Sequence, residues 1–379
     1  MTDFNSLLKN EESAVFSLRE LYRSYGYLPY KMSKFEEYDL YVRNKDFLVS
    51  DSIITFNDTN GKLLALKPDV TLSIVKNCGF EKGCTQKLFY NENVYRVSQG
   101  THAYKEIMQT GLECIGDVDV FDIAQVVSLA LMSLQKISDS FVLDVSHMGV
   151  ISAILREAEM DETFNKKIMA CIGEKNRHEI KNICEQYGTV KAVEEKLVSL
   201  VGIYGKKEEV FDKLQALSDS NEMKEALSEL SEIYDIISIS PLKDKINFDF
   251  SIVNDLTYYN GVVFKGYTEG LCESVLSGGQ YDELLRKMGK KGKAVGFAVY
   301  LDLLEELKRD RQKYDVDMLV LYNESSNRKM LSKLVGETIA KGKSVSVQKA
   351  VPEKLRYREK VSFIQGADGP TENRGENNG

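Results

Sequence analysis

Residues 149–241 separate two strand-rich parts of the chain and differ from both of them. They are dominated by Glu, Lys, Leu and Ile at helical spacing, as in VKAVEEKLVSLV and EMKEALSELSEIYDII, with Gly and Ser-Asp breaks between the segments. Strand patterns precede this stretch, in FVLDVSHM, and resume after it, in KINFDFSIV. The sequence therefore predicts an α+β fold, in which a mostly antiparallel sheet with flanking helices is interrupted by an all-helical insertion.

The part before the insertion contains both helix and strand signals. Residues 10–25 have apolar side chains at helical spacing and end in Tyr-Gly-Tyr, which favours a helix stop. Residues 119–137 are apolar almost all round, which indicates a buried helix. The other predicted elements are a hairpin in SIITFNDTNGKLLAL, a helix start in KPDVTLSIVKN, and a strand pair in KLFYNENVYRV and YKEIMQTGLECIG.

Strand and turn signals dominate the part after the insertion. The segment IVNDLTYYNGVVF (252–264) has two adjacent tyrosines, a predicted tight Asn-Gly turn and a buried strand, and it carries no cation. SGGQYDELL predicts a glycine turn leading into a helix, and AVGFAVYLDLLEELKRD predicts a strand that runs into a helix. VDMLVLY, NRKMLSKLVGETIAKG and KSVSVQ then predict a β-α-β unit, and the polar end GADGPTENRGENNG predicts disorder.

These patterns predict three regions. A core occupies residues 1–310 and includes the insertion at about 150–241. An α/β segment follows at 315–365, after a charged joint, and a disordered tail occupies 366–379. A length of 379 residues suits two or three domains with ample core.

The composition argues against several classes of function. A net charge of −8 argues against broad coating of nucleic acid, because phosphate binding needs a basic face. No run approaches about 18 apolar residues, and the N-terminus lacks the apolar core of a signal peptide, so we expect no membrane span and a cytoplasmic location. The six cysteines include no Cys-x-x-Cys pair and there are three histidines, so neither a metal site nor a cofactor is predicted.

Five segments occur in an order and at a spacing that resemble the catalytic core of class II histidyl-tRNA synthetases. The resemblance extends over about residues 10–310 and includes the place of the helical insertion. It implies a class II synthetase-like core, which is an antiparallel sheet flanked by helices. The segments are LALKPDVT (64–71), NVYRVSQGTHAYKEIMQTGLECIG (93–116), NDLTYYNGVVF (254–264), SGGQYDELL (277–285) and AVGFAVYLDLL (294–304).

The resemblance implies that the core keeps the amino-acid side of a histidine pocket. The acid and threonine of LKPDVT match the positions that hold the α-amino group, the amide and acid of IMQTGLE match histidine-contacting positions, and the tyrosine pair matches the lining of the imidazole pocket. Carboxylates pair with an ammonium, acids and amides accept from imidazole N–H, and phenol rings offer stacking area. The expected histidine-binding residues are Asp69, Thr71, Arg96, Gln109, Glu113, Tyr258 and Tyr259.

The nucleotide side departs from the family's pattern. Asn254 stands where the family has an arginine that acts on the reacting carboxylate and phosphate, Leu303 replaces an arginine that binds the γ-phosphate, and Tyr300 fills a glycine position under the nucleotide. Loss of one such cation costs about 10²–10³ in rate, so we assign no catalytic residue and expect no synthetase activity. The other departures are Ser33 at a proline position, Ser98 at an acidic position and Gln280 at an arginine position.

This combination resembles one subgroup, the synthetase-like regulatory subunits of ATP phosphoribosyltransferase in the first step of histidine biosynthesis. The resemblance implies a non-catalytic protein that binds L-histidine, assembles as a homodimer within a hetero-oligomer with a short catalytic subunit, and conveys activation and feedback inhibition. The C-terminal segment 315–365 corresponds to roughly half of an anticodon-binding domain, so no tRNA partner is expected. The alternatives are a divergent histidyl-tRNA synthetase or other amino-acid-activating ligase, and a synthetase-like protein for a different amino acid.

Purely structural roles stay open for each of these residues. Asp69 and Thr71 also suit the N-terminus of a helix, and the polar pair of IMQTGLE suits an ordinary strand face. Arg96 is either a structural ion-pair arginine or an effector-binding one. Tyr258 and Tyr259 point to opposite faces if the segment is extended, so at most one of them is expected to meet a ligand fully, and the other to serve packing.

Overall fold

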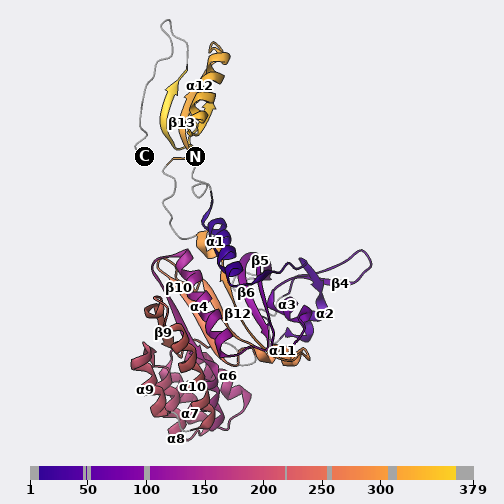
Figure 1. Ribbon diagram of the computed structural model, residues 1–379, viewed down its shortest axis with the longest axis vertical. Helices are drawn as coiled ribbons and strands as arrows, with labels where there is room; N and C mark the ends of the chain where they lie inside the picture. Colours follow the sequence, from indigo (N-terminus) through magenta and orange to yellow (C-terminus); the bar gives the residue numbers. More distant parts are fainter. Residues whose placement is uncertain are drawn as a thin grey trace. The chain divides into compact units, whose positions relative to one another are not determined.

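A nine-stranded sheet organises the larger of the two units into which the chain divides. The structure, a computed structural model, describes residues 8–45, 48, 53–97, 103–217, 220–253, 258–305 and 314–363. The larger unit runs from Lys9 to Leu307, and the second contains Lys308–Gly379 together with Met1–Leu8 (Figure 1).

Most neighbouring strands of the large sheet run antiparallel. Their order is β1-β5-β6-β12-β11-β10-β7-β9-β8, and only β1 with β5 and β7 with β9 are parallel. The α+β class with a mostly antiparallel sheet is therefore confirmed. The strands are β1 (Leu28–Pro29), β5 (Thr85–Val97), β6 (Tyr104–Gly116), β7 (Phe141–His147), β8 (Tyr204–Gly205), β9 (Ile246–Asp249), β10 (Val262–Thr268), β11 (Leu276–Gln280) and β12 (Lys293–Tyr300).

The strand pair β5–β6 is the longest in the sheet. Its register runs without interruption from Thr85 opposite Gly116 to Val97 opposite Tyr104, which confirms the predicted pair. The other edge of β6 pairs with β12, so that Glu113 lies opposite Gly296. Strand β6 therefore has a hydrogen-bonded neighbour on both sides, and its side chains are held at fixed positions on the sheet.

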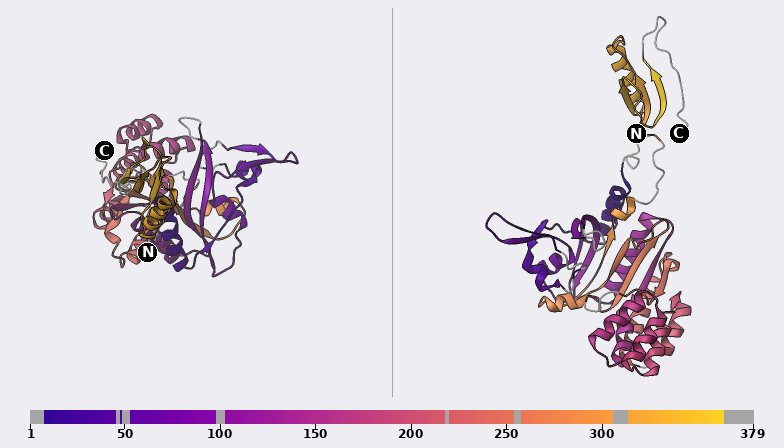
Figure 2. Two further views of the ribbon diagram at one scale, coloured as in Figure 1. Left: turned by 90° about the horizontal axis from the view of Figure 1, so that it is seen from above. Right: turned by 180° about the vertical axis from the view of Figure 1, so that it is seen from behind.

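Helices α1 (Asn10–Ser24) and α4 (Val120–Ile137) cover one face of this sheet (Figure 1). They pack on the strands through the main apolar core, which contains Phe89, Leu112 and Phe297. Helix α4 is long and apolar enough to cross a membrane, but half of it is buried inside this unit, as the sequence predicts for a buried helix. Figure 2 shows the molecule from behind, with strands of the sheet in view.

Six helices form the predicted insertion, but the insertion is not all-helical. The two-residue strand β8 lies within it and pairs with β9 at the edge of the sheet. A strand this short has no periodicity, which is why the sequence pattern missed it. The helices are α5 (Met148–Glu157), α6 (Glu162–Gly173), α7 (Arg177–Tyr187), α8 (Lys191–Leu200), α9 (Lys207–Leu217) and α10 (Asn221–Ile237).

The residues at the ends of these helices are of the types that usually cap helices. The side chains of Asp161 and Asn176 accept from backbone N–H groups at the starts of α6 and α7, and Gly188 ends α7 in the left-handed conformation. Helix α10 then packs against α4 and α5, which joins the insertion to the core.

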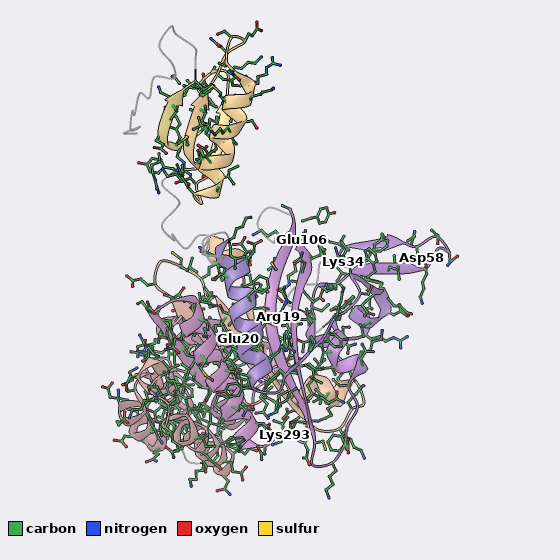
Figure 3. All side chains as sticks on the ribbon, turned by 45° about the horizontal axis from the view of Figure 1, so that its top comes forward. Arg19, Glu20, Lys34, Asp58, Glu106 and Lys293 are labelled. Atoms are coloured by element: carbon green, nitrogen blue, oxygen red, sulfur yellow. The ribbon has the colours of Figure 1, made fainter. Side chains whose placement is uncertain are left out.

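A small three-stranded sheet lies beside the large one and contains the predicted hairpin. Its order is β2-β4-β3, with antiparallel pairs, so the hairpin is confirmed. Asp58, labelled in Figure 3, accepts from the backbone N–H groups of Asn60 and Lys62 at 2.8 Å each, which closes the turn. The elements around it are β2 (Phe35–Glu37), α2 (Tyr38–Arg43), β3 (Thr55–Asn57), β4 (Leu63–Leu66) and α3 (Thr71–Asn77).

The predicted helix after β12 is present only as a short 3-10 helix, Asp302–Glu305, within the described ranges. The helix predicted after the glycine turn is α11 (Asp282–Lys287). A second short 3-10 helix, Lys243–Lys245, precedes β9.

The second unit contains the predicted β-α-β unit and one further strand. The strands are parallel in the order β14-β13-β15, and β15 was missed because its sequence, YREKVS, is mostly charged or polar. The likeness of this segment to part of an anticodon-binding domain stays a prediction, and the predicted disordered tail 366–379 lies outside the described residues. The elements are β13 (Val316–Leu321), α12 (Arg328–Ala340), β14 (Val345–Gln348) and β15 (Tyr357–Ser362).

A buried ion pair joins the end of the small sheet to β5. The Nζ of Lys67, which follows β4 directly, forms an ion pair with the carboxylate of Glu92, and the Lys67 side chain is 1% exposed. The Lys67 backbone also accepts from the N–H of Tyr95 at 2.9 Å. These contacts fix the segment between β4 and α3 against the large sheet.

We predict that Lys67→Met lowers the free energy of unfolding by about 3 kcal/mol, because it leaves the Glu92 carboxylate without its partner in a largely buried place. The exposed pair of Lys62 and Glu37 supplies the matched control, and Lys62→Met should change stability far less. Urea unfolding of both variants measures the difference. Equal effects would show that the buried pair has no special role.

Candidate amino-acid-binding site

The candidate site lies on the sheet face opposite α1 and α4. On β6, Leu112 and Cys114 belong to the core under α4, so the alternating residues Gln109, Gly111 and Glu113 point to the other face. Paired positions on the neighbouring strands extend this face in two rows of mostly small residues. One row is Glu113, Gly296 and Gly279, and the other is Gly111, Ala298 and Ser277.

Three glycines form a floor on which larger side chains lie. A Cβ added at Gly279 would stand 2.6 Å from the ring of Tyr259, and one at Gly111 would stand 2.6 Å from the hydroxyl of Tyr90. A Cβ at Gly296 would stand 1.8 Å from the Glu113 carboxylate. Any side chain at these positions would displace a group of the site.

The Glu113 carboxyl is the centre of the site. It is 2% exposed, and it accepts hydrogen bonds from the Thr71 hydroxyl at 2.8 Å and from the Tyr281 hydroxyl at 2.5 Å. Burial raises the pKa of Glu113 to about 8; the two hydrogen bonds oppose this shift and the charge of Asp69 adds to it. The group therefore keeps a proton at neutral pH unless a cationic ligand is bound.

Asp69 has a structural contact and also faces the site. Its carboxylate accepts from the backbone N–H of Leu72 at 2.8 Å, which satisfies an open donor at the start of α3. Burial raises the pKa of Asp69, while the Leu72 hydrogen bond and the charge of Arg96 oppose this shift. Thr71 donates to Glu113 and does not cap the helix through its side chain. A role at the start of helix α3 therefore does not by itself account for Asp69 and Thr71.

Tyr258 and Tyr259 pack against each other, and the extended chain that would point them to opposite faces is not present here. Their ring centroids are 4.5 Å apart at 57°, and the Tyr258 ring also lies 5.9 Å from that of Tyr281. The chain turns at Tyr258 and is not extended, so both rings can lie on the same side of the segment, in contact with each other. Burial raises the pKa of both phenols, so both are neutral hydrogen-bonding and stacking groups.

Asn260 and Gly261 do not form the predicted tight turn. The Asn260 amide donates to the Asp282 carboxylate at 3.0 Å and accepts from the Asp282 backbone N–H at 2.8 Å. The Asn260 backbone N–H donates to the carbonyl of Gln280 at 3.1 Å. These bonds tie the tyrosine segment to the start of α11, and they are long-range contacts that no local pattern reveals.

Arg96 and Gln109 lie towards the other end of the face. The Arg96 Nε donates to the carbonyl of Pro68 at 3.0 Å, and the guanidinium makes no ion pair with any residue of the described part. Gln109 is buried beside Tyr300 on the neighbouring strand, and its amide has no hydrogen-bond partner among the described residues. Burial raises the pKa of Tyr300, and the charge of Arg96 opposes this. A buried amide and an unpaired guanidinium are suited to a polar ligand.

The structure thus brings every expected pocket residue to one sheet face, while their role in holding histidine stays a prediction. Two further members, Tyr90 and Tyr281, were missed. The sequence feature that could have identified Tyr281 is its place in SGGQYDELL. The feature that could have identified Tyr90 is its position two residues from Glu92, on the same strand face. Both tyrosines are 2% exposed and face Glu113.

The residues that depart from the synthetase pattern divide between the site and its surroundings. Tyr300 lies on the site face, whereas the Leu303 side chain packs against the main core and Gln280 donates to Asp282 at 2.7 Å. Ser33 is an exposed loop residue that accepts from the backbone of Phe35. The positions of Ser98 and Asn254 lie outside the described residues. Within the described ranges, no group of three or more His, Cys, Asp or Glu side chains is arranged to hold a metal ion.

We predict that stability falls as pH rises from about 5 to about 8, and that Glu113→Gln makes this decline clearly shallower; part of it remains, because burial also raises the pKa of Asp144, to about 6. The folded protein keeps the Glu113 proton up to about pH 8, whereas the unfolded chain loses it near the ordinary value of 4.5. The folded state therefore binds more protons in this window, and raising the pH costs stability, by a few kcal/mol in total.

Urea unfolding across this pH window measures the effect. Glu106→Gln is the matched control, because Glu106 lies on the same strand, is exposed (Figure 3), and has a pKa that hydrogen bonds from Asn93 and Tyr95 lower. Its replacement should leave the slope between these pH values unchanged. A Glu113→Gln variant with the slope of the parent would contradict the assignment.

Comparison with known proteins connects this geometry to a family. The family model described as histidyl-tRNA synthetase matches residues 6–304. The ATP phosphoribosyltransferase regulatory subunit of Bacillus cereus (strain AH187) is 30% identical over 320 residues, which cover 80% of this chain and 74% of that protein. The protein of the same name from Oceanobacillus iheyensis is 26% identical over 307 residues, covering 80% of this chain and 75% of the relative.

Solved structures are also similar to this chain. An ATP phosphoribosyltransferase regulatory subunit/histidyl-tRNA synthetase from Bacillus halodurans has a TM-score of 0.74 and 25% identity, and covers 94% of this chain and 95% of its own. A chain of the ATP phosphoribosyl transferase complex from Thermotoga maritima shares the fold, with a TM-score of 0.59 and 17% identity over 77% of this chain and 97% of its own. The chain therefore belongs to the histidyl-tRNA synthetase-like family of ATP phosphoribosyltransferase regulatory subunits.

Proposed function

We propose that this chain is a non-catalytic regulatory subunit of an ATP phosphoribosyltransferase, and that it binds L-histidine at the site around Glu113. In this role it assembles, as a homodimer within a hetero-oligomer, with a short catalytic subunit, and it conveys both activation and feedback inhibition by histidine. The observation that carries the proposal is family membership combined with a polar, ring-lined site that has Tyr300 and Leu303 where the synthetase pattern has glycine and arginine.

The chemistry of the site supports histidine as the ligand. A protonated Glu113 beside a tilted pair of phenol rings suits an imidazole, which exchanges a proton near neutral pH and offers a flat ring. Asp69 suits an α-ammonium group, and its charge is stabilised by Arg96 and by the Leu72 hydrogen bond. Gln109 supplies a buried amide without a partner among the described residues. These groups can bind and orient a ligand without any chemical step.

The nucleotide side supports a non-catalytic role. Tyr300 places a buried phenol next to Arg96, at the position where the synthetase pattern has glycine. Leu303 gives its side chain to the core, so no cation stands at that position. Adenylate formation builds charge on a phosphate, and preorganised cations are the usual means of stabilising it.

The test combines the chain with a short catalytic ATP phosphoribosyltransferase. We expect a complex by light scattering, a higher rate of the catalytic subunit in the complex, and inhibition of that rate by L-histidine. The chain alone should show no histidine-dependent exchange of pyrophosphate into ATP. Absence of a complex together with no histidine effect would refute the proposal, and exchange at ordinary enzymatic rates would favour a divergent synthetase or another amino-acid-activating ligase.

We predict that Thr71→Val weakens L-histidine binding by about tenfold, because it removes a hydroxyl that holds Glu113 in place. Thr110→Val is the matched control. Thr110 is also buried on β6, but it donates to the Tyr90 carbonyl from the opposite strand face. Isothermal titration calorimetry should show unchanged affinity in this control. Equal losses in both variants would indicate a general effect on packing and not the loss of the Thr71 hydrogen bond to Glu113.

We predict that restoring arginine at both Asn254 and Leu303 does not create pyrophosphate exchange while Tyr300 remains. The phenol occupies space on the site face, and an arginine at position 303 has to leave a place in the apolar core. Exchange assays on the double variant, with circular dichroism to verify folding, measure this. Exchange well above background would show that Tyr300 is no obstacle.

A further inference from the structure

Lys265 is a cation on the site face that the pocket described above does not use. It lies on β10, directly opposite Ser277 of β11 on one side and Asp144 of β7 on the other. Residues opposite one another on paired strands share a face, so Lys265 continues the row of Gly111, Ala298 and Ser277. It directly follows the segment 252–264, which contains no cation of its own.

The ammonium group of Lys265 is partly buried and has no charged partner. Burial lowers its pKa, and no neighbouring acid offsets this. No described residue forms a hydrogen bond or an ion pair with it. Asp144, its cross-strand neighbour, is hydrogen-bonded to Asn247 on the far side, at 3.3 Å. A desolvated cation without a partner costs stability, which is tolerated where a ligand supplies the counter-charge.

Small side chains lie next to Lys265 on the site face. Ala298 and Ser277 have small side chains, and they lie between Lys265 and Gly111, which bears the Tyr90 hydroxyl. The Tyr259 ring lies on Gly279, two residues along β11 from Ser277. Lys265 thus borders the tyrosine wall of the amino-acid site, whereas Arg96 is on β5, beyond β6, at the other end of the face.

We propose that Lys265 forms an oxyanion subsite beside the amino-acid site. The subsite binds a carboxylate or phosphate group of a ligand that lies over the row of small residues Gly111, Ala298 and Ser277. The oxyanion is either the α-carboxylate of the bound amino acid or a separate phosphate. The subsite rests on the proposed function only for the identity of the amino acid. In it, Lys265, the next residue along the same strand, supplies the positive charge that the segment 252–264 lacks.

The experiment compares the parent protein with Lys265→Met and Lys293→Met in the full chain. Methionine keeps an unbranched side chain and removes the charge. Lys293 lies at the exposed start of β12 (Figure 3), three residues before Gly296 and on the opposite strand face, and is the matched control. Isothermal titration calorimetry uses three probes: L-histidine, L-histidinol, which has an alcohol in place of the carboxylate, and inorganic pyrophosphate.

Two outcomes support the subsite and identify its anion. If the anion is the amino-acid carboxylate, Lys265→Met weakens L-histidine binding by at least about tenfold and leaves L-histidinol binding unchanged. If the anion is a separate phosphate, the variant weakens pyrophosphate binding by a similar factor and leaves both amino-acid probes unchanged. Lys293→Met should match the parent with all probes. Thermal unfolding should show Lys265→Met at least as stable as the parent, because an unpaired desolvated charge is gone.

Two outcomes overturn the subsite. In one, Lys265→Met binds all three probes as the parent does. In the other, the parent binds L-histidine and L-histidinol equally and pyrophosphate not at all. Failure of the parent to bind L-histidine, with pyrophosphate binding that depends on Lys265, would refute the proposed amino acid and retain the oxyanion subsite.

Discussion

The buried Glu113 carboxyl is the contact on which the arrangement of this site depends. It accepts from Thr71 at the start of α3 and from Tyr281 just before α11, so two segments from distant parts of the chain meet on one strand. It fits only because Gly296, its cross-strand neighbour, has no side chain. A buried carboxyl that is fully hydrogen-bonded is tolerated, whereas one that loses a donor is costly, so each contact holds the others in place.

The sequence predicted those elements that have strong periodicity and missed those set by distant partners. The β5–β6 pair, the buried helix α4 and the hairpin at Asp58 follow from local patterns, and so does the common strand face of Gln109 and Glu113. The packing of the two tyrosine rings does not. It depends on a turn at Tyr258 and on hydrogen bonds from Asn260 to Asp282, and neither has a local signature. Motif resemblance found the pocket because it encodes such long-range contacts indirectly.

The positions of the positive charges distinguish a site that binds a ligand from a site that forms an adenylate. Arg96 is held by the Pro68 carbonyl and lies near Asp69, so part of its charge is already offset within the protein. Lys265 is desolvated and lies at the other end of the same face. Two cations so far apart do not converge on one phosphorus atom, as stabilisation of an adenylate transition state requires. They are suited to two separate anionic groups.

The tyrosine segment is also the place where a bound ligand can affect the rest of the molecule. The Gly261 carbonyl accepts from the backbone N–H of Met148, the first residue of α5, at 2.8 Å. The preceding residue, His147, is buried, and its Nε2 lies 3.2 Å from the Glu229 carboxylate of α10. Hydrogen bonds therefore connect the tyrosine segment and the end of β7 to two helices of the insertion, α5 and α10. Packed helices shift as units rather than deform continuously, so these two helices are the part of the core that is coupled most directly to the tyrosine segment.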